Sequence, residues 1–181
     1  LMSAYLRRNV ALANAPGTGV ADDKSIYPYV DKMIQFYLGE QPVLNNVPTY
    51  QCREQRDLDY VMANIEQLVV KEAQGSGGYG MLIGPQASKR QIDEFKAKVL
   101  AAPHLYIAQP TLDLSVCPTL TGSGAAERHI DLRPFVLSSP YRTEIVPGGL
   151  TRVAMQAGSL VVNSSQGGGI KDTWIIDSLH S

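Results

Sequence analysis

The sequence predicts an α+β fold, with helices in its first half and antiparallel strands in its second half. Apolar residues recur at helical spacing in several segments before residue 101. After residue 104, short runs rich in β-forming residues alternate with turns. Hydrophobic residues make up 44% and charged residues 18% of the chain, which suits an ordinary globular core. Together these observations favour helices that pack on antiparallel sheets.

The helices and strands expected in the first half follow from this apolar spacing and from the glycine and proline residues that end each periodic segment. One apolar face ends at Gly39 and another before Pro103, as expected at helix ends. Expected helices cover 2–8, 29–38, 56–67 and 89–100. Expected strands cover 10–13, 68–70, 80–83 and 105–108. The strands at 68–70 and 80–83 flank a glycine-rich stretch, so we expect them to pair as a hairpin.

The second half reads as strands joined by turns. Expected strands cover 129–137, 142–146, 151–155, 159–163 and 173–176. The changes of pattern divide the chain into 1–52, a helical segment; 53–110, with the glycine loop; and 111–181, an antiparallel part that we expect to be incomplete. No internal repeat or low-complexity stretch interrupts this order.

Composition narrows the function. The formal net charge of −1 and the pI near 6.3 argue against a basic face for nucleic acid. No apolar run approaches the roughly 20 residues that span a bilayer. No signal peptide is visible, and Cys52 and Cys117 are too few for a disulfide framework. We therefore expect a cytoplasmic protein without nucleic-acid or membrane partners. Because the chain begins with Leu1, we also expect a remainder of the same polypeptide upstream.

The strongest motif is Lys71 followed by a glycine loop. The segment 75–80 reads Gly-Ser-Gly-Gly-Tyr-Gly. Without Cβ atoms, its backbone N–H groups can approach a single anion, and Lys71 can place an ammonium beside it. A P-loop or a dinucleotide fold would need a helix after the loop, whereas Met-Leu-Ile follows here. A hairpin loop that closes over phosphates fits better, although such loops are as often plain turns.

Several segments together resemble the circularly permuted ATP-grasp family, the relatives of glutathionylspermidine synthetase. The segments with this resemblance are 14–24, 68–71 with the glycine loop, 106–110, 129–135, 147–154 and 163–169. They occur in the family's order over nearly all of the chain. The resemblance implies an ATP-grasp-like pair of subdomains, with the small one at 53–110 and the antiparallel core at 111–181. It implies ATP and Mg²⁺ as cofactors.

The resemblance also implies roles for particular residues. Lys71 would contact the α- or β-phosphate, and Arg133 and Arg152 would act catalytically on the phosphates or an acyl phosphate. The loop that would fold over the β- and γ-phosphates consists of Gly75, Ser76, Gly77, Gly78, Tyr79 and Gly80. The hinge that would meet adenine consists of Ile107, Ala108 and Gln109, with Pro110 after it. Further nucleotide-binding residues would be Asp131, Asn163, Gly167 and Gly168, with Gly169 in the same cleft.

The magnesium ligands are the exception. The family's Asp, Glu and Asn ligands would precede the lysine strand, and this sequence has no Glu-x-Asn pair. We therefore expect the ligands upstream of Leu1, leave the metal residues unassigned, and expect this chain alone to bind ATP weakly and turn over none. Its first 39 residues should also expose apolar surface.

Asp131 and Arg133 share one face of a strand, which is typical of a surface ion pair. Arg133 precedes Pro134 and Phe135 and is expected to be partly buried, and its planar guanidinium suits phosphate oxygens equally well.

The other candidates read as structural. His129 reads as a hydrogen-bonded residue near a strand start, and Cys117 as a small buried side chain. Lys24 is more often a solvated lysine at a helix start.

The function implied by the resemblance is ATP-dependent ligation of a carboxylate to an amine, or to a thiol, through an acyl phosphate. Peptide-like or polyamine-like substrates are expected from the same source. Two alternatives stay open: a small-molecule phosphotransferase and a non-catalytic nucleotide-binding module.

Overall fold

The computed structural model describes residues 1–12, 16–75, 80–139, 141–163 and 167–176. The chain forms two compact units, which are treated separately. The first unit comprises Leu1–Gly75 with Gly80–Thr111, and the second unit begins at Leu112. Among the helices in these described stretches, none has the length and apolar character required to cross a membrane.

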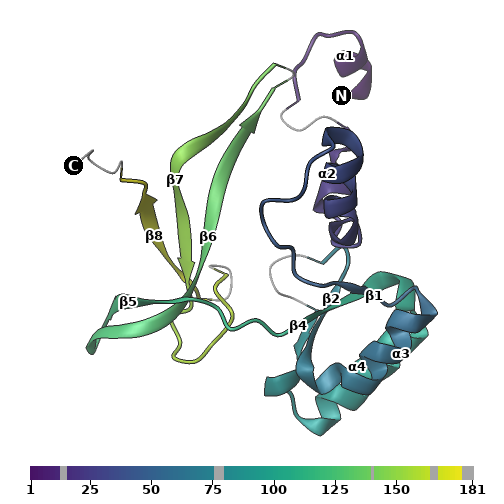
Figure 1. Ribbon diagram of the computed structural model, residues 1–181, viewed down its shortest axis with the longest axis vertical. Coiled ribbons are helices and arrows are strands. Elements are labelled where there is room, and N and C mark those ends of the chain that lie inside the picture. The colour runs from purple at the N-terminus through teal and green to yellow at the C-terminus, as the bar shows by residue number, and fades with distance from the viewer. Residues whose placement is uncertain (13–15, 76–79, 140, 164–166, 177–181) are drawn as a thin grey trace. The chain divides into compact units, whose positions relative to one another are not determined.

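The first unit is built on a four-stranded antiparallel sheet in the order β1-β4-β2-β3 (Figure 1). Its strands are β1 (Tyr50–Gln51), β2 (Leu68–Glu72), β3 (Met81–Ile83) and β4 (Tyr106–Pro110). The expected hairpin is confirmed, because β2 pairs with β3 and Lys71 lies opposite Met81. The central strand β4 pairs with β2 on one side and with β1 on the other.

Helices α3 (Gln55–Asn64) and α4 (Lys89–Ala101) pack against one face of this sheet (Figure 1). Both were expected, and a capping box starts α4: the Ser88 hydroxyl accepts a hydrogen bond from the backbone N–H of Gln91. The buried core contains Val61 and Ile65 from the α3 region, Val99 from α4 and Val70 from β2. Alternation along β2 therefore sends Leu68 and Val70 to the helices and Lys71 to the opposite face.

The segment before β1 departs most from expectation. Helices α1 (Met2–Leu6) and α2 (Val30–Leu38) form near the expected positions, with 3₁₀ turns at Thr18–Asp22 and Tyr27–Tyr29. Residues 10–12 form no strand, so the expectation of a strand there is wrong over its described part. Helix α2 buries none of its residues, and several large apolar side chains of the first 39 residues, such as Leu6, Phe36 and Tyr37, are exposed as expected.

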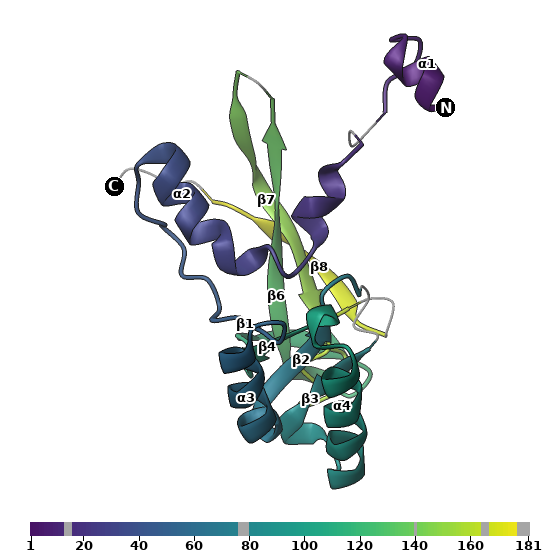
Figure 2. The same ribbon diagram turned by 90° about the vertical axis from the view of Figure 1, so that its right-hand side faces the viewer.

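The second unit is a four-stranded antiparallel sheet in the order β5-β6-β7-β8. Its strands are β5 (Val116–Thr121), β6 (Gly124–Ser138), β7 (Thr143–Val153) and β8 (Gly169–Trp174). Figures 1 and 2 show β6 and β7 side by side as a long ribbon. Strand β5 has no counterpart among the expected strands, and the strand expected at 159–163 is absent from these described residues. Two strands expected at 142–146 and 151–155 are a single strand, β7.

Glycines explain why β7 continues through a Pro-Gly-Gly sequence that looks like a turn. A Cβ on Gly149 would lie 2.9 Å from the carbonyl oxygen of Arg133 in β6. A Cβ on Gly148 would lie 2.8 Å from the carbonyl oxygen of Thr173 in β8. The glycines thus let the backbones of neighbouring strands lie close to β7, so β7 continues without a turn.

Candidate functional site

Lys71 begins a chain of hydrogen bonds across the face of the first sheet that points away from α3 and α4. Its ammonium donates to the side-chain carbonyl of Gln109 at 2.8 Å, and the Gln109 amide donates to the Thr49 hydroxyl at 2.8 Å. These residues come from β2, from β4 and from the position just before β1. The sheet therefore joins Lys71 and Gln109, two of the residues predicted to bind nucleotide.

The surroundings of Lys71 disfavour the charged form of its ammonium group. The side chain is partly buried, and removal of water lowers the pKa of its ammonium, with a further lowering by the nearby charge of Lys24. Gln109 is neutral, and none of the ion pairs among the described residues includes Lys71. A cation held in this way is suited to bind an anion.

Lys24 lies against the start of the glycine loop, a position that the sequence did not reveal. It is partly buried, and its ammonium donates to the backbone carbonyls of Gly75 and Ala73. The expectation of a solvated lysine is therefore wrong. Residues 24 and 73 are 49 positions apart, and no local pattern around Lys24 predicts that the chain returns to the glycine loop.

The described ends of the glycine loop are shaped around Glu72. A Cβ on Gly80 would lie 3.0 Å from the Glu72 carboxylate, and a Cβ on Gly75 would lie 3.1 Å from the Cβ of Glu72. Gly80 also has a φ of +65°, which favours glycine. Ser76, Gly77, Gly78 and Tyr79 lie outside the described residues, so their predicted phosphate contacts remain predictions.

The predicted adenine hinge lies in a fully paired part of the sheet. Ile107 and Ala108 are opposite residues of both β1 and β2, and both are almost fully buried. Their backbones have no open edge for a base to approach. Gln109 and Pro110 lie beyond the end of β1. Adenine binding by Ile107, Ala108 or Gln109 stays a prediction, and of the expected hinge only Gln109 and Pro110 lie outside the part of β4 that pairs with both neighbours.

In the second unit, Asp131 and Arg152 form the predicted site's main ion pair. They are opposite residues on β6 and β7, and Arg152 donates from Nε at 2.7 Å and also from Nη2 to the Asp131 carboxylate. This hydrogen bonding raises the pKa of the Arg152 guanidinium. The Asp131 carboxylate binds Arg152 instead of Arg133, so the expected surface ion pair between Asp131 and Arg133 is wrong. Arg133 is exposed, so the expectation that it is partly buried is wrong as well. Roles for Asp131, Arg133 and Arg152 with nucleotide remain predictions.

The second glycine cluster packs closely against the residues before it. A Cβ on Gly168 would lie 2.3 Å from the Val162 carbonyl oxygen and 2.8 Å from that of Asn163. The Gly168 N–H donates to the Asn163 carbonyl at 3.0 Å, and Gly167 has a φ of +83°. The close contacts at Gly168 and the positive φ at Gly167 each explain why a glycine occupies the position. Binding of nucleotide by Asn163, Gly167 or Gly168 stays a prediction.

The remaining candidates differ in outcome. His129 is hydrogen-bonded as expected, with its Nδ1 2.9 Å from the Leu114 carbonyl oxygen. Cys117 is partly exposed rather than buried, and the Lys171 ammonium lies 3.5 Å from its sulfur. Cys52 is buried, which raises the pKa of its thiol to about 11 and makes it unreactive.

A magnesium ion finds no suited set of ligands in the described stretches. Mg²⁺ is usually bound by one or two carboxylates with phosphate and water oxygens. Within those stretches, no three His, Cys, Asp or Glu side chains cluster, and the Asp131 carboxylate is held by Arg152. The residues present therefore do not fit a metal centre.

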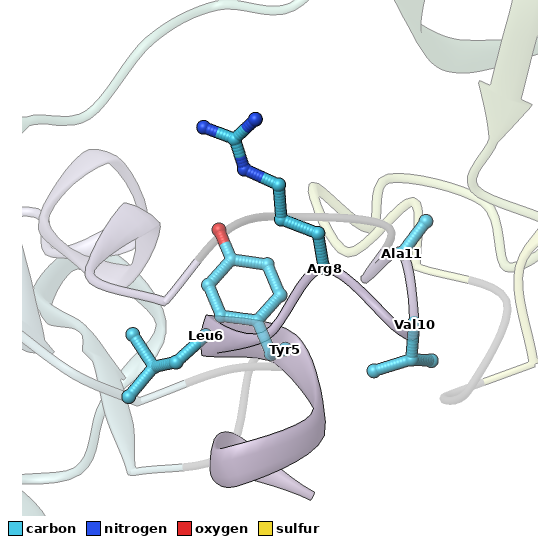
Figure 3. Close-up of a pocket in the computed structure, with 5 residues that line it drawn as sticks. All are labelled: Tyr5, Leu6, Arg8, Val10 and Ala11. Carbon is cyan, nitrogen blue, oxygen red and sulfur yellow. The ribbon is translucent and has the colours of Figure 1, made fainter.

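Two hollows lie outside the predicted site. The larger, of about 450 Å³, is formed by Tyr5 and Leu6 of α1 with Arg8, Val10 and Ala11 (Figure 3). All five residues come from one short stretch of chain, and the Arg8 guanidinium extends away from them (Figure 3). The smaller, of about 200 Å³, is lined by Gly19, Asp22, Asp23 and Gln74. Neither contains a residue predicted to bind nucleotide.

Substitutions on β6 should separate the paired residue from the exposed one. Asp131→Ala is expected to lower the unfolding free energy of the second unit by about 1–2 kcal/mol, because it leaves the half-buried Arg152 guanidinium unpaired. Arg133→Ala should change it by less than about 0.5 kcal/mol, because Arg133 is exposed. Urea denaturation of both variants measures the difference. Equal losses would mean that the ion pair adds no stability.

Comparison with known proteins identifies a matching family model and several proteins of similar sequence. The family model for circularly permuted ATP-grasp type 2 matches residues 1–154. An uncharacterized protein of Synechocystis sp. is 56% identical over 176 residues, which cover 97% of this chain and 37% of that protein. One from Mycobacterium tuberculosis is 46% identical over 97% of this chain and 32% of its own length.

A Frankia alni protein named "Putative glutamate--cysteine ligase 2-3" is 47% identical over 97% of this chain and 20% of its own length. The chain thus spans between a fifth and two fifths of the relatives described here. The family model covers most of the chain, including Lys71, the glycine loop, β4 and the Asp131–Arg152 pair. The chain belongs to the circularly permuted ATP-grasp type 2 family.

Proposed function

We propose that this chain is the ATP-binding part of an ATP-dependent ligase that joins a carboxylate to an amine. The observation that carries the proposal is Lys71: a partly buried ammonium with a neutral partner, at the start of a glycine-rich hairpin. Membership of an ATP-grasp family and the ligase name of the Frankia relative support it. The contribution of this chain is to hold and orient the triphosphate.

The contacts in the first unit suit this task. The Lys71 ammonium exchanges the Gln109 carbonyl for a phosphate oxygen, which is a stronger partner because it is charged. Backbone N–H groups of the glycine loop close over the same phosphates. The backbone of Gln109, beyond the part of β4 that pairs with β1, meets the adenine edge. Gln109 thereby serves both groups: its side chain is the partner of Lys71, and its backbone is the proposed contact of adenine.

The proposed reaction needs charge neutralisation and alignment rather than a protein nucleophile. A carboxylate oxygen forms a bond to the γ-phosphorus while the bond to ADP breaks. The amine nitrogen then attacks the acyl carbon, phosphate leaves and the amine gives up a proton to solvent. Arg133 and Arg152 are proposed to face the phosphate or the acyl phosphate. Because Arg152 is held by Asp131, Arg133 is the arginine whose exposed position allows a direct contact.

The substrates are proposed only as a class. The match covers a fifth of the Frankia protein, so its name does not say which part of that protein acts on glutamate and cysteine. Peptide-like or polyamine-like substrates, kinship with glutathionylspermidine synthetase, Mg²⁺ from ligands elsewhere in a longer polypeptide and a cytoplasmic location are proposals of the same kind. The absence of ATP turnover by this chain alone also stays a prediction, and a magnesium-dependent release of phosphate would contradict it.

Lys71→Ala tests the proposal. The change removes a charge-assisted phosphate contact, so ATP should bind about tenfold or more weakly. Isothermal titration calorimetry of the 181-residue chain measures the affinity. Lys98→Ala, in the last turn of α4, is the matched control and should bind ATP like the wild type. ATP affinity that is unchanged in Lys71→Ala, with an intact circular dichroism spectrum, would remove Lys71 from the site.

A further inference from the structure

Thr49 is the last side chain in the chain of hydrogen bonds on the first sheet. Its hydroxyl contacts the Val47 carbonyl at 3.0 Å and the Gln109 side-chain amide at 2.8 Å. The Val47 N–H donates in turn to the Tyr27 hydroxyl at 3.1 Å, so the backbone around Val47 is held as well. The hydrogen bonds thus connect β4 with the residues before β1 and with the 3₁₀ turn Tyr27–Tyr29.

The number of protons fixes the direction of these hydrogen bonds. A hydroxyl has one proton, and a carbonyl oxygen can only accept, so the Thr49 proton points to Val47. Thr49 is therefore an acceptor for Gln109, whose amide presents its nitrogen to Thr49 and its carbonyl to Lys71. A lysine ammonium only donates, so both ends require the same orientation of the amide.

This orientation distinguishes the two protonation states of Lys71. An ammonium offers its N–H donors to the fixed carbonyl, whereas a neutral amine has a lone pair that needs a donor. The amide nitrogen of Gln109 lies on the side of Thr49, so it provides no such donor. The oriented amide therefore favours the charged form of Lys71. This opposes burial and the charge of Lys24, which lower the pKa of Lys71.

The other described groups around Lys71 do not supply this effect. Lys24 acts against the charge, and the Glu72 carboxylate lies against Gly80. The residues that share the cross-strand row of Lys71 on β3, β4 and β1 are all neutral: Met81, Ile107 and Gln51. The Gln109 carbonyl is thus the acceptor that the structure gives to this ammonium.

We propose that Thr49 is a positioning residue of the nucleotide site, which holds the Gln109 carbonyl against the Lys71 ammonium while no ligand is bound. The carbonyl stands in for the phosphate oxygen that later replaces it and keeps Lys71 charged until then. Thr49 acts through Gln109 and does not touch the ligand. The proposal rests on the proposed function and adds to it a residue that prepares the empty site.

Thr49→Val tests the proposal, because it removes the hydroxyl and keeps the shape of the side chain. The Gln109 amide can then turn its nitrogen toward Lys71, which favours the neutral amine. The pKa of Lys71 should fall by about half a unit to one unit, the equivalent of one neutral hydrogen bond. NMR titration of the Lys71 side chain in the 181-residue chain without nucleotide measures this pKa. Thr49→Ala covers the case in which Thr49→Val does not fold.

Two further variants serve as controls. Thr49→Ser keeps the hydroxyl and should restore the wild-type pKa of Lys71. Thr119→Val is the matched control, because the Thr119 hydroxyl also donates to the carbonyl two positions before it, that of Cys117. It removes the same local contact without an amide beyond it, so the pKa of Lys71 should stay at the wild-type value.

A double substitution separates positioning from a general effect on the fold. Gln109→Met removes the amide through which Thr49 acts. In a chain with Gln109→Met, adding Thr49→Val should therefore shift the pKa of Lys71 no further. A second shift of the same size would mean that Thr49 acts by another route and would overturn its positioning role.

ATP titrations connect this inference to the proposed function. Binding needs the ammonium, so ATP affinity should fall as pH rises through the pKa of Lys71. The fall should begin at lower pH in Thr49→Val and stay in place in Thr49→Ser and Thr119→Val. Calorimetry at several pH values measures it.

The outcomes distinguish the two proposals. An unchanged pKa of Lys71 in both Thr49→Val and Thr49→Ala would overturn the role of Thr49 and leave the nucleotide site in place. Equal ATP affinity of Lys71→Ala and the wild type would overturn the proposed function. It would also remove Thr49 from a nucleotide site, whatever the pKa of Lys71.

Discussion

Gly84→Ala is expected to lower the unfolding free energy of the first unit by about 3 kcal/mol, at the upper end for overpacked sites. Gly84 is buried after β3, and a Cβ there would lie 2.1 Å from the Ile65 carbonyl oxygen and 2.7 Å from the Glu66 carbonyl carbon. Both contacts are with backbone, so no side chain can move aside. The α3 end and the residues after β3 would have to separate.

Gly19→Ala is the matched control, because a Cβ on Gly19 meets nothing within 4 Å. It should leave the unfolding free energy within about 0.5 kcal/mol of the wild type. Denaturant titration followed by circular dichroism compares the two variants. A stability of Gly84→Ala equal to that of Gly19→Ala would contradict the close packing of the 3₁₀ turn after α3 (Ile65–Gln67) on this turn.

Ile65→Ala is expected to lower the same free energy by about 3–4 kcal/mol, within the range for a large aliphatic side chain truncated in a core. The Ile65 side chain is 1% exposed and belongs to the cluster formed by α3, α4 and the sheet. The loss combines the transfer of apolar groups with the cavity that remains. Because Lys71 lies on the opposite face of the sheet, ATP affinity of the folded fraction should change little.

Ile65→Val provides the graded comparison, with an expected loss of about 1 kcal/mol for a single methylene. Denaturant titration measures stability, and calorimetry at low temperature measures ATP affinity. An Ile65→Ala loss no greater than that of Ile65→Val would mean that the core closes around the gap. A large loss of ATP affinity in a fully folded Ile65→Ala chain would contradict the separation of core and site.

Elements with local signals were predictable. Ser88 and Gln91 form a capping box, and the helix expected at 89–100 is α4 (Lys89–Ala101). Short apolar strands on either side of the glycine loop form the β2–β3 hairpin, whose pairing needs no distant residue. The placement of Lys71 on the face away from the helices follows from strand alternation alone.

Elements that depend on a partner strand were not predictable. Residues 10–12 and 159–163 are rich in apolar residues, but neither described stretch pairs with a strand. In the β7 segment, Pro147, Gly148 and Gly149 are typical turn residues and predict two strands instead of one. No local pattern shows that the backbones of β6 and β8 lie close to Gly148 and Gly149. This close approach is the reason that the glycines belong to one continuous strand.

For the candidate site, the sequence by itself determined that Lys71 stands before a glycine loop and that this loop joins two strands. Only the tertiary structure decided which groups surround Lys71. It brought Gln109 beside Lys71 and Thr49 beside Gln109, placed Lys24 on the start of the loop from 49 residues away, and paired Asp131 with Arg152 rather than Arg133. The physical reason is that hydrophobic periodicity sets which face of an element is buried. The register and order of strands set which side chains meet across it.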